Sequence, residues 1–203
     1  GAVAGGAGTA IFIDSTNHDA YIYQSFRFYT TEGMNISGSK TSDGSYNYRN
    51  LTISNSGILY FNGAYTTDGD GTAPILTLTG NFTLGSGSTV SGDGLGYGAG
   101  GAGHTTGYGP GGTYGTYSGG GGGHGGVGGN GGDGGVGGAV YGSVSAPVTL
   151  GSGGGGETPA NGGAGGAGGS AIKIVASGTA DISGTITSDG ANGGCGGYVS
   201  SRG

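Results

Sequence analysis

The sequence predicts an all-β protein in which strand repeats, arranged as a β-sandwich or a β-solenoid, are combined with a bundle of polyglycine II helices and essentially no α-helix. Three observations carry this prediction. Glycine supplies 61 of the 203 residues, part of the chain repeats with a period of three, and short alternating strands recur between turn residues. No apolar stripe follows the 3.6-residue spacing of a helix.

The period of three is clearest in residues 119–138, which read GGGGGHGGVGGNGGDGGVGG and follow a strict x-Gly-Gly triplet from His124 onward. This period fits neither an α-helix nor a strand. It fits the polyproline II helix, which has three residues per turn and no internal hydrogen bonds. Two faces of such a helix would carry no side chain, so their amides are open to neighbouring backbones. We expect this stretch to form the centre of the bundle.

Composition narrows the class of protein. Four prolines are too few for collagen, and disorder is the alternative interpretation of the glycine-rich residues 91–170. Only 8% of residues are charged, the net charge is −6, and the five Lys and Arg residues are scattered, so we expect no nucleic-acid partner. No apolar run reaches the length of a membrane span, so we expect no membrane insertion.

A low charge combined with abundant Ser, Thr, Tyr and Asn is typical of extracellular fibres and coats, so the expected location is extracellular, at a cell surface or on a virion. The first residue is Gly1 and not Met, which fits a removed secretory leader or a trimmed sequence. The single cysteine, Cys195, excludes an intrachain disulfide. It is either a small residue in a Gly-Gly-Cys-Gly-Gly run or the site of an intermolecular disulfide.

Shifts in composition divide the chain into three regions. Residues 1–91 form a β-rich domain with an N-terminal arm, residues 92–170 form the glycine-rich polyglycine II region, and residues 171–203 form a β repeat that returns to the first sheet and ends in a glycine-rich tail. Residues 20–30 alternate Tyr and Ser with Ile and Phe, which favours a strand. Further strands are predicted at 10–14, 34–39, 46–54, 58–63, 75–80, 81–85 and 88–94, with turns at 42–44 and 55–57.

Three blocks dominate the glycine-rich region: residues 94–103, residues 119–138, and the pair 151–156 and 161–169. At about 3.1 Å per residue, blocks of this kind span roughly 30–45 Å and can lie side by side as rods. Residues 139–150 are predicted to be a strand or an extended return.

An internal repeat connects the first and last regions. Residues 75–98 and 171–194 align without gaps, with Leu76-x-Leu78 opposite Ile172-x-Ile174 and both copies reaching an Asp-Gly pair. A weaker third copy begins at Leu51, aligned with Ile172. The repeated unit is typical of a solenoid rung or a sandwich hairpin, with chance similarity as the alternative.

Aliphatic residues alternate with Thr, Ser and Asp in these copies, so one face of each strand is expected to be buried and the other solvated. An exposed sheet edge recruits further strands, and strand addition between copies of the chain is therefore the predicted mode of assembly.

Candidate chemistry is sparse. Asp68-Gly69-Asp70-Gly71 opens like a calcium loop but lacks the following Glu, so Asp68 and Asp70 are metal candidates whose alternative is a turn. His18, His104 and His124 have no partners at metal-ligand spacing. We expect no enzyme activity, no cofactor and no metal centre.

Two sets of surface residues are candidates for contact or modification. Asn35, Asn50 and Asn81 each begin an Asn-x-Ser/Thr sequon and are glycosylation candidates, with coincidence in a Ser/Thr-rich chain as the alternative. Tyrosines occur at intervals among the glycine blocks, and we expect them to pack between rods or between subunits. The alternative is that their rings are exposed and stack on sugars. The contact candidates are Tyr108, Tyr114 and Tyr117.

The blocks NGGAGGAGG and HGGVGGNGGDGGVGG resemble the polyglycine-sandwich domains of phage tail-tip adhesins and the glycine-rich repeat domains of bacterial surface proteins, over roughly residues 92–170. The adhesin resemblance implies receptor binding through loops at the tip of the bundle, with residues 108–117 as the candidate loop. The flanking β repeat is not part of that pattern and is more similar to the stacked-strand modules of extracellular fibres.

The sequence therefore favours a structural subunit of a self-assembling extracellular filament, surface coat or virion appendage, whose partners are copies of itself. The alternative is a receptor-binding adhesin of a phage tail fibre or cell surface that recognises a glycan or a surface protein. Ice binding is disfavoured because the x positions of the triplets are mixed and form no uniform Thr or Ala face.

Overall fold

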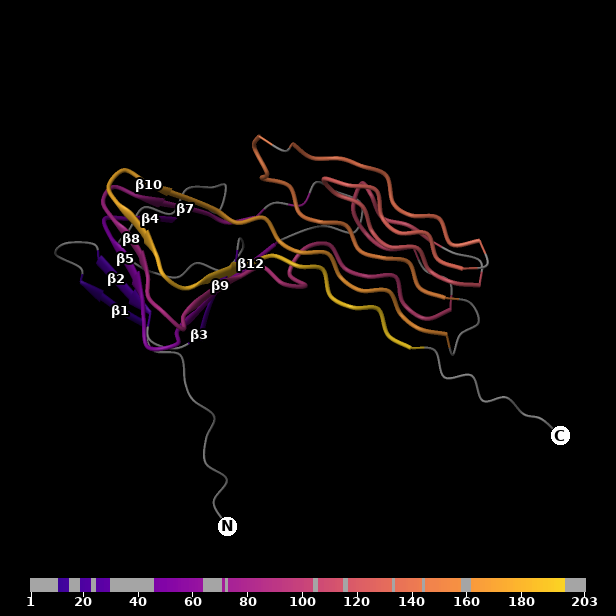
Figure 1. The fold of residues 1–203 in the computed structure, drawn as a ribbon, viewed down its shortest axis with the longest axis horizontal. Coiled ribbons are helices and arrows are strands. Elements are labelled where there is room, and N and C mark those ends of the chain that lie inside the picture. The colour runs from indigo at the N-terminus through magenta and orange to yellow at the C-terminus, as the bar shows by residue number, and fades with distance from the viewer. Residues whose placement is uncertain are drawn as a thin grey trace, which may run out of the picture. The chain divides into compact units, whose positions relative to one another are not determined.

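The computed structural model describes residues 11–14, 19–22, 25–29, 46–63, 71, 73–103, 106–114, 117–132, 134–143, 145–157 and 162–195. They form two compact units (Figure 1). The β-solenoid unit contains the described parts of Gly1–Asn62 together with Pro74–Ser91 and Ile172–Thr187. The glycine-rich unit contains the described parts of Gly63–Ala73, Gly92–Ala171 and Ser188–Gly203.

The solenoid unit consists of short strands, and the described residues include no helix. In chain order the strands are β1 (Ile11–Asp14), β2 (Asp19–Ile22), β3 (Ser25–Tyr29), β4 (Tyr46–Tyr48), β5 (Leu51–Ile53), β6 (Ile58–Asn62), β7 (Ile75–Leu78), β8 (Phe82–Leu84), β9 (Thr89–Ser91), β10 (Lys173–Ala176), β11 (Ala180–Ile182) and β12 (Thr185–Thr187).

These strands form three sheets, ordered β1-β2-β5-β8-β11, β10-β7-β4 and β12-β9-β6-β3. Each of the last three turns of the chain contributes one strand to each sheet: the second rung is β4–β6, the third rung is β7–β9 and the last rung is β10–β12. All described pairings are parallel except that of β1 with β2. Parallel stacking of successive rungs is a β-solenoid, and it excludes the β-sandwich alternative, whose sheets are antiparallel.

The solenoid core is built from columns of aliphatic and aromatic side chains that stack in register. Ile53 pairs with Leu84, and Leu59 pairs with Val90, and all four are fully buried. Buried and partly buried residues alternate along β5 to β8, because successive side chains of a strand point to opposite faces. The buried cluster is Tyr48, Leu51, Ile53, Leu59, Phe61, Leu76, Leu78, Phe82, Leu84 and Val90.

The turn between β5 and β6 matches the prediction at 55–57. Asn55 and Ser56 both have positive φ angles, of 54° and 58°, and the N–H of Gly57 donates to the carbonyl of Ser54. Asn tolerates this left-handed conformation better than most residues, which explains why an Asn begins the turn.

The glycine-rich unit has no strands among its described residues, yet its extended segments run side by side and are joined by backbone hydrogen bonds (Figure 1). Bonds between segments 97–103 and 151–157 recur at every third residue of both: Tyr97 N–H to Gly151, Gly100 N–H to Gly154, and Gly103 N–H to Glu157. Segment 163–169 pairs antiparallel to the same segment with the same period: Gly151 N–H to Gly169, Gly154 N–H to Gly166, and Glu157 N–H to Gly163.

Segment 151–157 is the centre of this unit. It bonds to residues of four neighbouring segments, and residues 152–156 are all buried. The prediction that residues 119–138 form the centre is wrong. That stretch doubles back on itself, since the N–H of Gly121 donates to Gly129 and the N–H of Gly138 donates to Gly121, and most of the described residues of 125–137 are exposed or half-buried.

Glycine is required where segments approach most closely. A Cβ on Gly153 would lie 1.9 Å from the Gly98 carbonyl oxygen, and one on Gly166 would lie 1.8 Å from that of Ala191. By contrast, nothing lies within 4 Å of a Cβ placed on Gly125, Gly126 or Gly129. The few large side chains of the unit form a small cluster of Tyr97, Leu150 and Ala171, with Ala73 packed against it.

Several element predictions need correction. The predicted strand over 46–54 is two strands, β4 and β5, because the solenoid turns a corner at Arg49 and Asn50. The described part of 139–150 contains no strand, so of the two alternatives predicted for it only the extended return stays open. The predicted strand at 34–39 and the turn at 42–44 lie outside the described residues.

The repeat is present as stacked rungs, but its predicted alignment is partly wrong. Leu76 pairs with Ile174 and not with Ile172, whereas Thr89 pairs with Thr185 as predicted. The third copy is misplaced by a whole strand, since Leu51 of β5 pairs with Phe82 of β8 and therefore shares a sheet with β11.

Candidate functional site

The most distinctive surface of the solenoid unit is the end formed by the last rung. In each of the three sheets the order terminates at a strand of this rung: β11, β10 and β12. Among the described residues, no strand pairs with their outer sides. Every second N–H and C=O of an edge strand points away from its neighbour, so this end presents three backbone edges against which no described strand lies.

Side chains that belong to the core are exposed at this end. Ile182 continues the fully buried column of Ile53 and Leu84, yet it is 53% exposed. Ile186 continues the column of Leu59 and Val90 and is 43% exposed. The two isoleucines are exposed because no further rung covers them. We call this surface, formed by β10–β12 with Ile182 and Ile186 at its centre, the open end.

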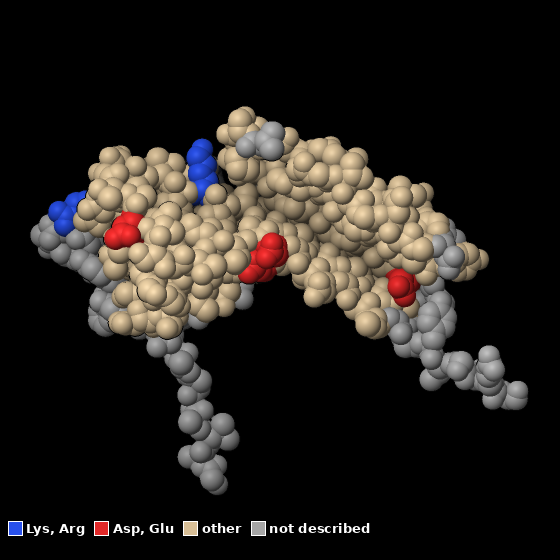
Figure 2. All heavy atoms as spheres, in the orientation of Figure 1, with Lys and Arg blue, Asp and Glu red and all other residues tan. Residues whose placement is uncertain are grey.

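The open end has no charge directed into the core columns. Its charged residues, Lys173 and Asp181, occupy the alternate strand positions that face away from the core, and they have opposite signs. Inward-pointing charges and prolines are devices by which natural sheets block edge pairing, and β10–β12 contain neither. Figure 2 shows how few charged side chains interrupt the face of the molecule in view.

The opposite end of the solenoid is different. There the first sheet terminates in β1, which pairs antiparallel with β2 in the register Ile11 to Ile22. The other two sheets terminate in β3 and β4. The two ends therefore present different backbone edges, so the rungs have a polarity along the solenoid axis.

An asparagine ladder stabilises one corner of the solenoid. The N–H of Asn81 donates to Oδ1 of Asn50 at 2.6 Å, and the N–H of Thr179 donates to Oδ1 of Asn81 at 2.9 Å. Each asparagine thus binds the backbone of the next rung. The ladder ends at Thr179 in the last rung, where no asparagine is present.

This ladder gives two of the sequon asparagines a structural role that sequence reasoning missed. Asn50 and Asn81 lie on successive rungs, which are about 4.8 Å apart, so glycans on both would crowd each other. Glycosylation of Asn50 and Asn81 stays a prediction, and Asn35 lies outside the described residues.

The three contact tyrosines are on the surface of the glycine-rich unit. Tyr108, Tyr114 and Tyr117 are all exposed, the last two by 58% and 64%. Their exposure does not support packing between rods within one chain, and packing between subunits stays a prediction. Tyr97, in contrast, is buried, and its hydroxyl accepts a hydrogen bond from the N–H of Gly71.

A network of polar side chains surrounds Tyr141. The Tyr141 hydroxyl donates to the carbonyl of Leu150 and accepts from Oγ of Ser152 at 2.8 Å, and its ring meets that of His124 edge-on. His124 Nε2 lies 2.9 Å from Thr149 Oγ1, so this triplet side chain is held in the network. Burial raises the pKa of the Tyr141 hydroxyl, and the hydrogen bond from Ser152 opposes this rise.

The presence of a metal-binding group can be judged only for the part of the chain that the structure describes. That part contains no group of His, Cys, Asp and Glu that could hold a metal ion. Asp68, Asp70, His18 and His104 lie outside it, so the metal candidates stay predictions. Cys195 is a free, exposed thiol. The described residues also include no helix with the length and apolarity needed to cross a membrane.

Comparison with known proteins identifies no relative: no family model, no curated protein and no solved structure matches the chain.

Proposed function

We propose that this protein is a structural subunit of a self-assembling extracellular filament, surface coat or virion appendage, joined end to end by strand addition at the open end of the solenoid. The observation that carries the proposal is the exposure of Ile182 and Ile186 at positions where the preceding rung has fully buried Leu84 and Val90.

Association at the open end would satisfy two requirements together. It would cover the two isoleucines, which are about half exposed, so each gains roughly half of the about 1.5–3 kcal/mol that full burial of such a side chain contributes. It would also pair the outer amides of β10–β12, which act as a template for further strands. Because the two ends of the solenoid present different edges, joining the open end of one copy to the opposite end of the next is a heterologous contact. Such contacts generate filaments when they do not close into rings.

The glycine-rich unit supports the same role. We interpret its segments as polyglycine II rods, since their hydrogen bonds recur every three residues, which is the repeat of that helix. Rods joined through their backbones form a stiff body with few flexible side chains. Such a body suits a filament or coat outside the cell better than an enzyme.

The test compares two lysine substitutions in the last rung, followed by electron microscopy and sedimentation of the purified full chain. Ile182→Lys places a charge where the next rung would bury it, which raises the concentration needed for polymers at least tenfold. Val175→Lys is the matched control, because Val175 is an exposed residue of the same rung on the outward face, next to Lys173. We expect the control to polymerise like the unaltered chain.

Discrete monomers or closed dimers of the unaltered chain at high concentration would contradict the filament. Equal loss of polymers in both variants would contradict the assignment of the contact to the core columns.

A second function, receptor binding as an adhesin, is favoured by the exposed tyrosines of residues 108–117. Exposed aromatic rings are common in sugar and protein recognition because they offer a large contact area with a polar tip. A glycan array with the unaltered chain and with Tyr114→Ala and Tyr117→Ala tests this function. Binding that both substitutions weaken supports it, and no binding at any concentration removes it.

A further inference from the structure

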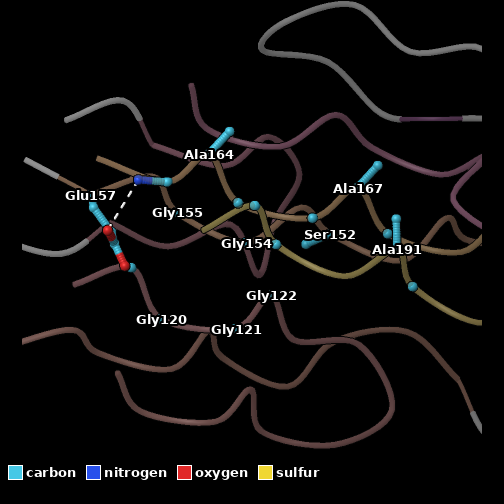
Figure 3. Close-up of a pocket in the computed structure, with 18 residues that line it drawn as sticks. Gly120, Gly121, Gly122, Ser152, Gly154, Gly155, Glu157, Ala164, Ala167 and Ala191 are labelled. Carbon is cyan, nitrogen blue, oxygen red and sulfur yellow. Dashed lines mark hydrogen bonds between the residues drawn. The ribbon is translucent and has the colours of Figure 1, made fainter. Parts of the chain in front are cut away.

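A groove of about 400 Å³ opens in the glycine-rich unit between segments 119–122, 152–157, 163–168 and 190–194 (Figure 3). This volume is within the usual range for ligand-binding clefts, about 300–1,000 Å³. Apart from Ser152 and Glu157, the lining is glycine and alanine. The methyl groups of Ala164, Ala167 and Ala191 point away from Gly120–Gly122 in Figure 3, so the groove is walled mainly by backbone.

Two rows of backbone groups without hydrogen-bond partners belong to segments that line this groove. Within the described residues, neither the N–H nor the C=O of Gly119, Gly122, Gly190 and Gly193 makes a hydrogen bond. The members of each row are three residues apart. Adjacent residues in the chain are already hydrogen-bonded within the unit. The carbonyl of Gly120 accepts from the N–H of Gly155, and the N–H of Ala191 donates to the carbonyl of Ala167.

We propose that this groove binds an extended glycine-rich strand of a second copy of the chain, residues 125–130. A strand with a three-residue repeat would present amides to both rows at matching intervals. The strand must be glycine-rich, because backbone-to-backbone pairing at this spacing leaves no room for Cβ atoms, as the close contacts within the unit show.

Residues 125–130 fit this description. Their sequence is GGVGGN, without charge, and a Cβ on Gly125, Gly126 or Gly129 would meet nothing within 4 Å, so one side of the segment is open. The groove offers no free charge to a partner either. Its one ionisable lining residue is Glu157, and Oε2 of Glu157 accepts a hydrogen bond from the N–H of Gly163 at 3.0 Å.

The choice of a second copy as the partner rests on the proposed self-assembly, but the groove belongs to the other unit of the chain. The contact at the open end and the contact in the groove can therefore be tested separately. The experiment uses the full chain with Ile182→Lys, labelled with ¹⁵N, so that association through the open end does not interfere.

The probe is a peptide of residues 125–130, acetylated and amidated at its ends. We expect the amide resonances of Gly119, Gly122, Gly190 and Gly193 to shift on titration, while those of Gly125 and Gly129 stay in place. The control peptide replaces each glycine with alanine and is expected to cause no shift. No shift at saturating peptide, or shifts scattered over exposed glycines elsewhere, overturns the proposal. If filaments still form from the unaltered chain, the proposed function stands without it.

A proline substitution tests the hydrogen-bonding row directly. Gly190→Pro removes an N–H that has no partner among the described residues, and a Cβ there meets only the Ala167 carbonyl oxygen at an ordinary 3.4 Å. Gly132→Pro is the control, since the N–H of Gly132 also has no hydrogen-bond partner among the described residues but lies outside the groove. We expect Gly190→Pro to weaken peptide binding about tenfold and Gly132→Pro to leave it unchanged. Equal affinity of the two variants overturns the assignment of the site.

Discussion

The two units of this chain pair their backbones with equal regularity but pack by opposite means. In the solenoid, in-register columns of Leu, Ile and Phe fill the space between three sheets. In the glycine-rich unit, the large buried side chains of the described residues are Tyr97 and Leu150, and backbone packs on backbone. The first unit depends on side-chain volume being present, and the second depends on its being absent.

The energetic terms differ accordingly. Burying apolar side chains contributes roughly 25 cal/mol per Å², which offsets the entropy of ordering the solenoid strands. The glycine segments lack this contribution, and glycine loses more conformational entropy on folding than any other residue. Each hydrogen bond adds only about 0.5–1.5 kcal/mol net, so the unit needs a dense network in which single residues bond in several directions. Segment 151–157, with four neighbouring segments, is such a network.

The largest expected effect comes from removing volume in the solenoid. Leu84→Ala leaves a cavity in the middle of the column between Ile53 and Ile182 and is expected to reduce the free energy of unfolding by about 2–5 kcal/mol. Thr83→Ala, at the neighbouring position on the opposite face, is the control and should cost less than about 1 kcal/mol. Hydrogen-exchange mass spectrometry of peptides from each unit measures both. Equal costs would show that the columns do not carry the stability of the solenoid.

Adding volume is the corresponding test of the glycine-rich unit. Gly153→Ala places a Cβ 1.9 Å from the Gly98 carbonyl oxygen, and neither backbone can move without breaking its other bonds. We expect this single methyl group to cost about 1–3 kcal/mol, in the range of overpacked cores.

Gly125→Ala is the matched control, because nothing lies within 4 Å of the added Cβ. It should leave stability unchanged or raise it slightly, since alanine restricts the unfolded chain more than glycine does. Faster hydrogen exchange in both variants would mean that glycine is needed for flexibility and not for close approach.

The sequence predicts the all-β class well, because alternation and turn residues are local signals. The register of the repeat is harder to predict. Four residues connect β8 to β9, whereas two connect β11 to β12, so an alignment that is correct at Thr89 and Thr185 is wrong by two residues at Leu76. A gapless comparison cannot represent a turn that differs in length between rungs.

The candidate sites depend on information that is not local. Ile182 has the same pattern around it as Leu84, and only the absence of a further rung makes it exposed. The asparagine ladder could have been found from the sequence, since Asn50 and Asn81 each directly precede a strand of the same sheet, but only with the correct register. The centre of the glycine-rich unit was misplaced because triplet regularity shows which segments can be rods and not how many neighbours each one has.

The smallest expected effect is a pH dependence confined to the glycine-rich unit. The Tyr141 hydroxyl is buried against Leu150 and Ser152, and burial raises its pKa above the ordinary value of about 10. The unfolded chain therefore loses this proton at a lower pH than the folded chain. The stabilisation is fully present below about pH 10 and is lost as the pH rises through the pKa of the folded state. Tyr141→Phe removes this dependence, and it also lowers stability at neutral pH because the bonds to Leu150 and Ser152 are lost.

Hydrogen exchange in residues 139–157, measured between pH 8 and about 11 and compared between the unaltered chain and Tyr141→Phe, isolates Tyr141 from the other tyrosines. Parallel profiles for the two chains would show that the hydroxyl is as well solvated in the folded unit as in the unfolded chain.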